Sequence, residues 1–492
     1  MLSFKQLKSF FLENRSTKQT IVKNTFWLTV SSIFSKLFKY FLIIYAARLL
    51  GVIQYGYFNF AMSFAALFAV FSDLGISSLI SRDLAKDKET EIKIPAIFTL
   101  KLLLVIGSFL LIVFASFFAP NSSLLQKAII LMAVFVTINS LSNFLYNCFY
   151  GREEMQYQTI TEITENGIAT ILGIYLLFHL PYATSLTFAY AVSALVGFIV
   201  IFNLFIRRFG KILKLKIDTQ EWKRVFNLSW PLALSGIFAL IYTYTDTVML
   251  GFWKLFEQIG YYNAAQKIIA LAIFPATLIV TSFLPTFSRH STINKQKAQT
   301  IFNYQNLALL ALALPIVFGG YILGNGLILH FYGENYLPAV LALKILLLMA
   351  GISYLSTSLG YTLFIYNQHK KAFWAYLIGA LLNVPLNALL IPRYGFYGAA
   401  IATVITAFIS FLVLVYLVKC NTPLKLIDWS FIKYFLPIIV ATILMSLVLI
   451  LGAKYNLNVF LKVLGGGLVY LISIAGFLLF DKNSFFLSDR TK

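Results

Sequence analysis

Residues 24–47 read NTFWLTVSSIFSKLFKYFLIIYAA, an apolar run in which the charged members are Lys36 and Lys39. A helix that crosses a bilayer needs about 20 mostly apolar residues, because each residue adds about 1.5 Å towards a hydrocarbon core of about 30 Å thickness. This run is long enough to cross a membrane once, and it carries two lysines into the segment that crosses.

Runs of this kind continue through the chain. Of its 492 residues 60% are hydrophobic and 12% are charged, with a mean hydropathy of +0.83, whereas about 25% of the residues of an average soluble protein are charged. The composition therefore predicts an all-α integral membrane protein with about fourteen transmembrane helices. The predicted spans are 24–47, 57–81, 94–118, 124–149, 157–179, 182–206, 225–250, 259–287, 302–324, 337–366, 372–391, 395–418, 431–451 and 459–480.

The basic residues of the loops alternate along this map. The loops on one side of the membrane carry few of them, namely Arg48, Lys127, Lys254, Arg393, Lys454 and Lys462, and the other side carries most of the rest. By the positive-inside rule, both termini are predicted to be cytoplasmic, with the protein in the cytoplasmic (inner) membrane. The net charge of +21 is thus interpreted as a topology signal and not as a nucleic-acid surface, which needs a clustered basic face.

Several chemistries lack their usual residues. Cys148 and Cys420 are too few and too far apart for a disulfide framework or a thiolate metal site, and the four histidines are scattered. A nucleotide-binding GxxxxGK[ST] loop is missing from the sequence. We therefore predict no metal centre, no cofactor and no enzyme activity.

A short motif occurs twice, about 200 residues apart. Residues 50–51 (LG) and 56–61 (GYFNFA) are echoed by 250–251 (LG) and 260–265 (GYYNAA), each between the first and second helix of its half. Because an even number of helices separates the copies, the halves are predicted to have parallel topology. The alternative is that pairs of glycine and aromatic residues simply recur in membrane proteins.

The repeat suggests a division of the chain into two lobes of six helices. The predicted organisation is a basic cytoplasmic segment (1–23), an N-lobe (24–206), a basic cytoplasmic linker (207–224), a C-lobe (225–418), and two further helices with a cytoplasmic tail (419–492). Parallel repeats of this kind occur in transporters that bind their substrate between two lobes and alternate its access.

Lys36 and Lys39 are spaced i, i+3, so both ammonium groups leave one face of their helix. A charge near the bilayer centre costs about 2.5–3.5 kcal/mol on insertion scales, so such residues indicate a functional interior or a partner. An anionic diphosphate headgroup would suit two neighbouring lysines. The alternative is that their long side chains snorkel to the cytoplasmic interface.

Acidic residues inside the predicted spans invite two interpretations. Glu162 and Glu165 repeat the i, i+3 spacing; they either take up protons or pair with Arg152, or they are merely solvated near the loop. Asp246 either binds a coupling proton or cation or pairs with Lys267 of the next helix. For Asp73 the same choice between coupling and structural pairing applies.

Four stretches resemble the oligosaccharide flippases, often called the Wzx-type family, of the multidrug/oligosaccharidyl-lipid/polysaccharide (MOP) exporter superfamily. They are 47–51 (ARLLG), 73–75 (DLG) with 82–85 (RDLA), 246–251 (DTVMLG) with 260–265 (GYYNAA), and 394–400 (YGFYGAA). Each motif is moderately specific, but their order and spacing together cover essentially the whole chain.

The resemblance implies a MATE-like V of two pseudo-twofold six-helix lobes around a central cavity, with two extra C-terminal helices. Related lipid II flippases carry a cavity arginine where Lys36 stands, whereas their next cationic and acidic positions fall on the apolar Leu42 and Ile43. This departure predicts a glycan other than lipid II. The candidate cavity residues are Lys36, Lys39, Arg48, Asp73, Arg152 and Lys267, and the candidates for binding a coupling ion are Asp246, Glu162 and Glu165.

The predicted function is a flippase that moves an oligosaccharide linked to polyprenyl diphosphate across the membrane, driven by a proton or sodium gradient. Its partners would be the lipid-linked oligosaccharide, the bilayer and other polysaccharide-assembly proteins. One alternative is a MATE-like antiporter of drugs or cations, which would favour an acidic cavity. A less favoured alternative is a membrane glycan polymerase or acyltransferase, which would need a large outer loop rich in arginine or histidine.

Overall fold

The computed structural model describes residues 13–14, 16–120, 123–210, 215–428, 434–455 and 457–480. Most of the predicted segment 1–23, and the tail after Phe480, therefore lie outside the described residues. The chain divides into two compact units, Met1–Gly260 and Tyr261–Lys492. The lobe boundaries given above stay a prediction, and each unit is described by itself.

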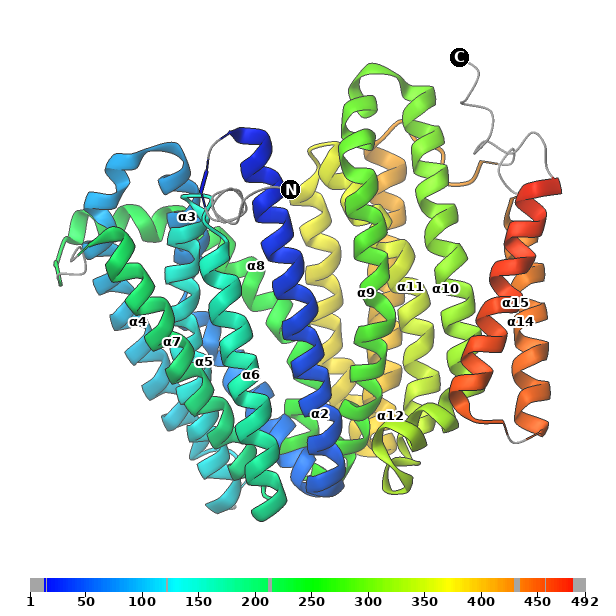
Figure 1. Cartoon of the computed structure of the whole chain (residues 1–492), viewed down its shortest axis with the longest axis horizontal. Coiled ribbons are helices and arrows are strands. Elements are labelled where there is room, and N and C mark those ends of the chain that lie inside the picture. The colour runs from blue at the N-terminus through cyan, green and yellow to red at the C-terminus, as the bar shows by residue number, and fades with distance from the viewer. Residues whose placement is uncertain are drawn as a thin grey trace, which may run out of the picture. The chain divides into compact units, whose positions relative to one another are not determined.

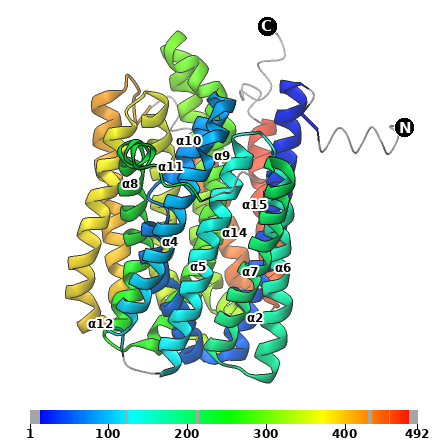
Figure 2. The same ribbon diagram turned by 90° about the vertical axis from the view of Figure 1, so that its left-hand side faces the viewer.

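Helices make up both units (Figures 1 and 2). The first contains α2 (Thr17–Ala69), η1 (Val70–Ser72), α3 (Ile76–Lys86), η2 (Lys88–Lys93), α4 (Ile94–Ser116), α5 (Ser123–Tyr150), α6 (Gln156–His179), α7 (Ala183–Phe209), α8 (Thr219–Phe252) and the start of α9 (Phe256–Ile293). The second contains the rest of α9, then α10 (Lys295–Tyr332), η3 (Glu334–Tyr336), α11 (Ala339–Ile365), α12 (His369–Asn421), α14 (Phe435–Lys454) and α15 (Val459–Phe480).

The predicted fold class is confirmed. In the part of the chain that the structure describes, ten helices are long and apolar enough to cross a membrane. One of them, α12, contains two predicted spans, and another, Thr17–Ser72, contains the span 24–47 and the first part of the span 57–81. The remaining two predicted spans correspond to α6 and to the apolar stretch Gly236–Phe252 of α8. The chain is a multi-pass, all-helical membrane protein.

The connection between the first two predicted spans is shorter than expected. We predicted a loop over residues 48–56, but helix continues on both sides of Gly51, the residue with non-helical dihedral angles (φ 69°, ψ 172°). A positive φ is accessible to glycine because it has no Cβ. Gly395, with φ 57°, interrupts α12 in the same way. In each case the change of direction is confined to one residue.

The predicted span 57–81 is wrong as a single helix. α2 ends at Ala69, η1 follows, and α3 begins only at Ile76, after Leu74 (φ 44°) and Gly75 (φ 78°). The carboxylate of Asp73 accepts hydrogen bonds from Ser77 and Lys101 at this break. The apolar composition alone did not indicate the interruption, because the residues around it are still hydrophobic.

The predicted linker 207–224 is partly helical. α7 continues to Phe209, and α8 begins at Thr219 with the Asp218 side chain accepting a hydrogen bond from the backbone N–H of Glu221. Arg224 then binds Glu221 and Asp83 of α3 at 2.5 and 3.2 Å. The Trp222 indole donates to the carbonyl oxygen of Ala96 at 2.8 Å. These contacts fix the start of α8 against α3 and α4.

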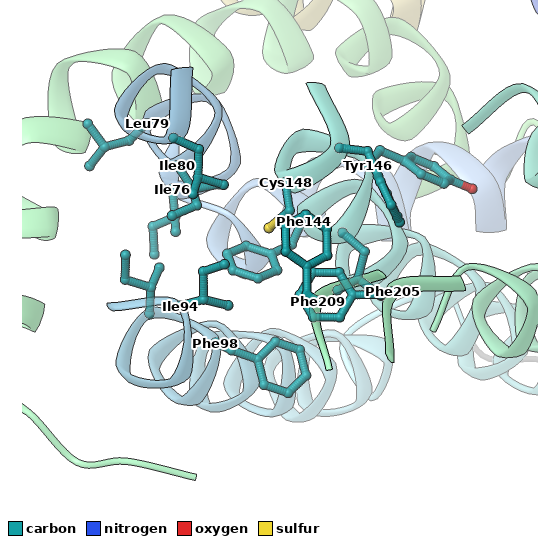
Figure 3. Packing of buried hydrophobic residues seen from close by; sticks show 14 of the residues in the cluster. Ile76, Leu79, Ile80, Ile94, Phe98, Phe144, Tyr146, Cys148, Phe205 and Phe209 are labelled. Atoms are coloured by element: carbon teal, nitrogen blue, oxygen red, sulfur yellow. The ribbon is translucent and has the colours of Figure 1, made fainter. Parts of the chain in front are cut away.

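Large apolar side chains hold the helices of the first unit together. Figure 3 shows Ile76 and Ile80 of α3 and Phe98 of α4 around Phe144 of α5, with Phe205 of α7 beside them. Phe144 and Phe205 are completely buried. Each of these aromatic rings buries a large apolar area, so the cluster packs α3, α4, α5 and α7 against one another.

Two stretches of the first unit, around Gly56 of α2 and around Gly260 of α9, contact each other. A Cβ atom on Gly56 would overlap the carbonyl oxygen of Phe256, and one on Gly260 would overlap the carbonyl oxygen of Val52. Within the first unit, these two stretches of α2 and α9 therefore approach each other closely at both glycines. Tyr57 and Phe256 pack edge to face beside it, with ring centroids 4.7 Å apart.

Candidate functional site

A polar pocket of about 430 Å³ lies inside the first unit, between α2, α5 and α6. Its lining residues are Ser32, Ser35, Lys36, Lys39, Asn139, Asn143, Tyr146, Glu162, Glu165 and Asn166. Four of the nine residues predicted from the sequence, Lys36, Lys39, Glu162 and Glu165, are thus brought together. Pockets that bind small ligands are typically about 300–1,000 Å³, so this one falls within the usual size range.

Helical spacing explains how three elements present these side chains. On α5, Asn139, Asn143 and Tyr146 recur at i, i+4 and i+7, which places them on one face of the helix. On α6, Glu162, Glu165 and Asn166 share a face for the same reason, opposite the lysine face of α2. The pocket therefore has a cationic wall on α2 and a wall of amides and carboxylates on α5 and α6.

Glu162 is tied to the helices around it. Its carboxylate accepts a hydrogen bond from the Ser31 hydroxyl at 2.5 Å and one from the Gln158 amide at 2.6 Å, one on each oxygen. The bond to Ser31 joins α6 to α2. These two hydrogen bonds hold the Glu162 side chain against α2 and the preceding turn of α6.

Glu165 has a different environment. The Asn139 side chain of α5 hydrogen-bonds to it, and Lys39 of α2 acts on it as an opposite charge. Gly197 of α7 lies directly behind it, with no side chain between the two helices. Glu165 is therefore the acid whose immediate partners line the pocket.

Two hydroxyl groups at the pocket wall carry no bound partner. Within the described part of the chain, neither the Ser35 hydroxyl nor the Tyr146 hydroxyl has a hydrogen-bond partner. Tyr146 is only 7% exposed, and Figure 3 shows its hydroxyl directed away from the apolar cluster that holds its ring. Buried polar groups are normally satisfied, so an unsatisfied pair beside a cavity indicates room for a polar ligand or water.

Sequence reasoning missed the uncharged members of this lining. Asn166 was not among the predicted site residues, and neither were Asn139, Asn143 and Tyr146. A signal existed: these three form a polar stripe at helical spacing in a span that is otherwise apolar. Charged side chains interrupt an apolar run clearly, whereas single asparagines and tyrosines lower its hydropathy less and are harder to recognise in the sequence.

Asp73 belongs to a separate network. It forms an ion pair with Lys101 of α4 at 2.5 Å, and Lys101 also donates to the Ser140 hydroxyl of α5 at 2.7 Å. Ser140 in turn receives a hydrogen bond from Ser72 at 2.6 Å. Lys101 is completely buried. Asp73 is therefore paired with Lys101 and lies outside the pocket lining, and its role in coupling or in structural pairing stays a prediction.

Arg152 also has an ion-pair partner outside the pocket. Its guanidinium binds Glu91 through Nε at 2.8 Å and Nη2 at 2.5 Å, and donates to the carbonyl oxygen of Leu84 at 3.2 Å. These contacts join the turn between α5 and α6 to α3 and η2. The structure thus pairs Arg152 with Glu91, which the sequence had not suggested.

The remaining three predicted residues lie elsewhere. Arg48 is exposed on α2, just before Gly51. Asp246 is 1% exposed on α8 in the first unit, whereas Lys267 is half-buried on α9 in the second unit. The proposed pairing of Asp246 with Lys267 stays a prediction.

Comparisons with known proteins agree with this architecture. The chain is 22% identical to the probable low-salt glycan biosynthesis flippase Agl15 of Haloferax volcanii, over 92% of this chain and 94% of that protein. Its fold is similar to the lipid II flippase MurJ in an inward closed conformation, with a TM-score of 0.76 and 20% identity over 92% of this chain and 98% of that one.

A second solved structure is an inward-facing multidrug resistance MATE family transporter of the MOP superfamily. The TM-score is 0.64 at 15% identity, and the match covers 81% of this chain and 98% of the transporter. These structural likenesses show the fold, which flippases and drug transporters share. The family model described as "Polysaccharide biosynthesis protein" matches residues 21–291, more than half of the sequence. The chain therefore belongs to the polysaccharide biosynthesis protein family.

Proposed function

We propose that this protein is a flippase that moves an oligosaccharide linked to polyprenyl diphosphate across the cytoplasmic membrane. The family and the naming of the Haloferax relative as a glycan biosynthesis flippase support a glycan as the cargo. The observation that carries the proposal is that Lys36 and Lys39 line one pocket inside an apolar helical unit. Two ammonium groups one turn apart need an anion or water to share the site.

The diphosphate would bind at the lysine wall of the pocket. Each ammonium group offers three donors to phosphate oxygens, and such charge-assisted hydrogen bonds are short and strong in surroundings of low polarity. The amides of Asn139, Asn143 and Asn166 offer donors and acceptors to the hydroxyl groups of the first sugar. Arg48 and Lys267 remain proposed further contacts along the path of the cargo.

Transport would proceed by alternating access of two lobes, coupled to an ion gradient. Glu165, Glu162 and Asp246 are the proposed sites for a proton or sodium ion, because carboxylates inside a membrane are the usual groups for such coupling. The basic loops support cytoplasmic N- and C-termini. Other polysaccharide-assembly proteins would supply and remove the lipid-linked glycan.

One observation favours a second candidate, the MATE-like antiporter. Glu162 and Glu165 give the pocket two carboxylates, which would attract a cationic drug. Their placement argues for the glycan, since Glu162 is bound by Ser31 and Gln158 and Glu165 is hydrogen-bonded to Asn139. Both lysines would repel a cation, whereas a diphosphate uses them directly.

Transport in proteoliposomes tests the proposal. The purified protein is reconstituted with a lipid-linked oligosaccharide, and the rate at which the glycan reaches the far leaflet is measured with a membrane-impermeant glycan-cleaving enzyme. We expect Lys36→Ala to lower this rate about tenfold or more, because one charge-assisted hydrogen bond contributes about 1.5–3 kcal/mol. Lys36→Arg keeps the positive charge and should retain most of the rate.

The matched control is Lys297→Ala, which removes an exposed lysine near the start of α10 and should leave the rate unchanged. Equal rates for the wild type and for Lys36→Ala would remove the assignment of the pocket. Efflux of a cationic dye from the same vesicles, without glycan transport, would instead establish the antiporter.

A further inference from the structure

The contact between α6 and α7 behind the pocket is unusually close at one point. A Cβ atom built on Gly197 of α7 would lie 3.0 Å from Oε2 of Glu165 and 3.2 Å from its Cβ. Carbon atoms in favourable contact are about 3.5–4.0 Å apart. Gly197 is buried, so the absence of a side chain there provides the space in which the Glu165 side chain lies.

The other neighbours of Glu165 come from α2, α5, α6 and α7. Glu162 lies one turn before it on α6 and carries a like charge; Asn139 of α5 hydrogen-bonds to it; Tyr146 of α5 and Tyr190 of α7 are within electrostatic reach. Lys39 of α2 attracts it across the pocket. Because Gly197 lies behind Glu165 and the pocket lies on its other side, a Glu165 side chain displaced from α7 would move into the pocket, whose lining includes Lys39.

We propose that Gly197 is a positioning residue of the pocket: it lets the Glu165 carboxylate rest against α7, so that Lys39 stays available to the phosphate groups of the ligand. The proposal rests on the proposed function, because it takes a diphosphate as the ligand at Lys36 and Lys39. Gly197 acts through Glu165 and does not itself contact the ligand. A carboxylate pushed onto Lys39 would compete with the diphosphate for the same ammonium group.

Binding of farnesyl diphosphate to the purified full-length protein in detergent tests the proposal, with calorimetry giving Kd. We expect Gly197→Ala to raise Kd about fivefold or more, by shifting the Glu165 carboxylate away from α7 and towards Lys39. Glu165→Gln has nearly the same shape without the charge. In the Glu165→Gln background, Gly197→Ala should therefore change Kd less than twofold.

Comparing the effect of Gly197→Ala in the wild type with its effect in the Glu165→Gln background separates an effect of the Glu165 charge from an effect on helix packing. An equal rise in Kd in both backgrounds would mean that the added methyl group only disturbs helix packing, and would overturn the proposal. An unchanged Kd for Gly197→Ala would overturn it as well. Gly167→Ala is the matched control, because a Cβ on Gly167 of α6 meets no atom within 4 Å, and its Kd should equal that of the wild type.

Two further results complete the test. Gly197→Ala alone could fail to fold, and in that case the double variant Gly197→Ala with Glu165→Ala is used, because it removes the colliding carboxylate. This double variant should fold, and its Kd should equal that of Glu165→Ala. Failure of the double variant to fold would also overturn the proposal. The proposed function fails separately, if the wild type does not bind farnesyl diphosphate or if Lys36→Ala and Lys39→Ala leave its Kd unchanged.

Discussion

The first unit contains two groups of charged residues within its helices, and they are built differently. In the network at the break between α2 and α3, Lys101 is completely buried and is bound by Asp73 and Ser140. In the pocket between α2, α5 and α6, Lys36, Lys39 and Glu165 line a cavity of about 430 Å³. The charged groups of the network are bound to one another, whereas the charged groups of the pocket surround an open cavity.

The difference indicates how a membrane protein uses costly charges. A buried ion pair whose hydrogen bonds are all made inside the protein serves packing and geometry. Charges around an open polar volume are stabilised by whatever enters it, water or ligand. We therefore expect substitutions in the network to affect stability, and substitutions in the pocket to affect binding and transport.

The largest effect on stability is expected for Lys101→Met. Methionine has a similar length, but it leaves the Asp73 carboxylate without its ion-pair partner. Breaking a buried pair costs about 3–5 kcal/mol, and we expect the lower end of this range because the Asp73 side chain is 25% exposed. The Tm of the purified protein should fall by about 5 °C or more. The measurement is thermal unfolding in detergent, followed by intrinsic fluorescence.

Asp73→Asn combined with Lys101→Met is the control for this prediction. It removes both charges, so no uncompensated carboxylate remains, and its Tm should lie closer to that of the wild type. If Lys101→Met lost transport while keeping its Tm, the network would be part of the transport path. This result would contradict the assignment of the network to stability and of the pocket to transport.

An intermediate effect on stability is expected for Glu162→Gln, because Glu162 shares features with both the network and the pocket. Glu162 lines the pocket but is bound by Ser31 and Gln158 as firmly as a member of the network. Glutamine keeps one acceptor oxygen and loses the charge, so we expect a loss of about 1–2 kcal/mol. A reduced Tm with unchanged Kd for farnesyl diphosphate would be the result.

Ser31→Ala removes the same hydrogen bond from its other end. The decreases in Tm caused by Glu162→Gln and Ser31→Ala should therefore be less than additive in the double variant. Strict additivity would show that the two residues act independently, and a large rise in Kd for Glu162→Gln would assign this residue to the ligand instead.

The smallest effect is expected for Arg224→Ala at the start of α8. Its guanidinium pairs with Glu221 and Asp83, but the side chain is 35% exposed, and exposed ion pairs contribute about 0–1 kcal/mol. At low ionic strength, the Tm of Arg224→Ala should be slightly lower than that of the wild type. In about 0.5 M salt this difference should shrink, because dissolved ions screen the attraction between exposed charges. A loss as large as that of Lys101→Met would contradict the ranking by burial.

The sequence was sufficient for the fold class and for the charged half of the pocket. Long apolar runs predict membrane helices because nothing else buries so many consecutive hydrophobic residues, and charges within those runs are conspicuous, which is how Lys36 and Glu165 were found. Hydropathy did not predict the break at residues 70–75, because it depends on backbone dihedral angles at Leu74 and Gly75 and on the long-range contact of Asp73 with Lys101.

The partners of each charge also could not be predicted. Arg152 was expected near Glu162 or Glu165 but binds Glu91, which is 61 residues away in the sequence. Gly197 carries no sequence signal at all, since glycine is common in membrane helices. Such relations follow from how helices rotate and pack, and an amphipathic pattern constrains rotation only weakly when most faces are apolar.

The single-residue change of direction at Gly51 has a consequence for how the protein meets its surroundings. A protease needs several residues of extended chain to seat a cleavage site, and helix on both sides of Gly51 offers it none. Trypsin added to intact vesicles should therefore leave Arg48 uncut although the residue is exposed. The first two membrane passages should survive digestion as one undivided fragment.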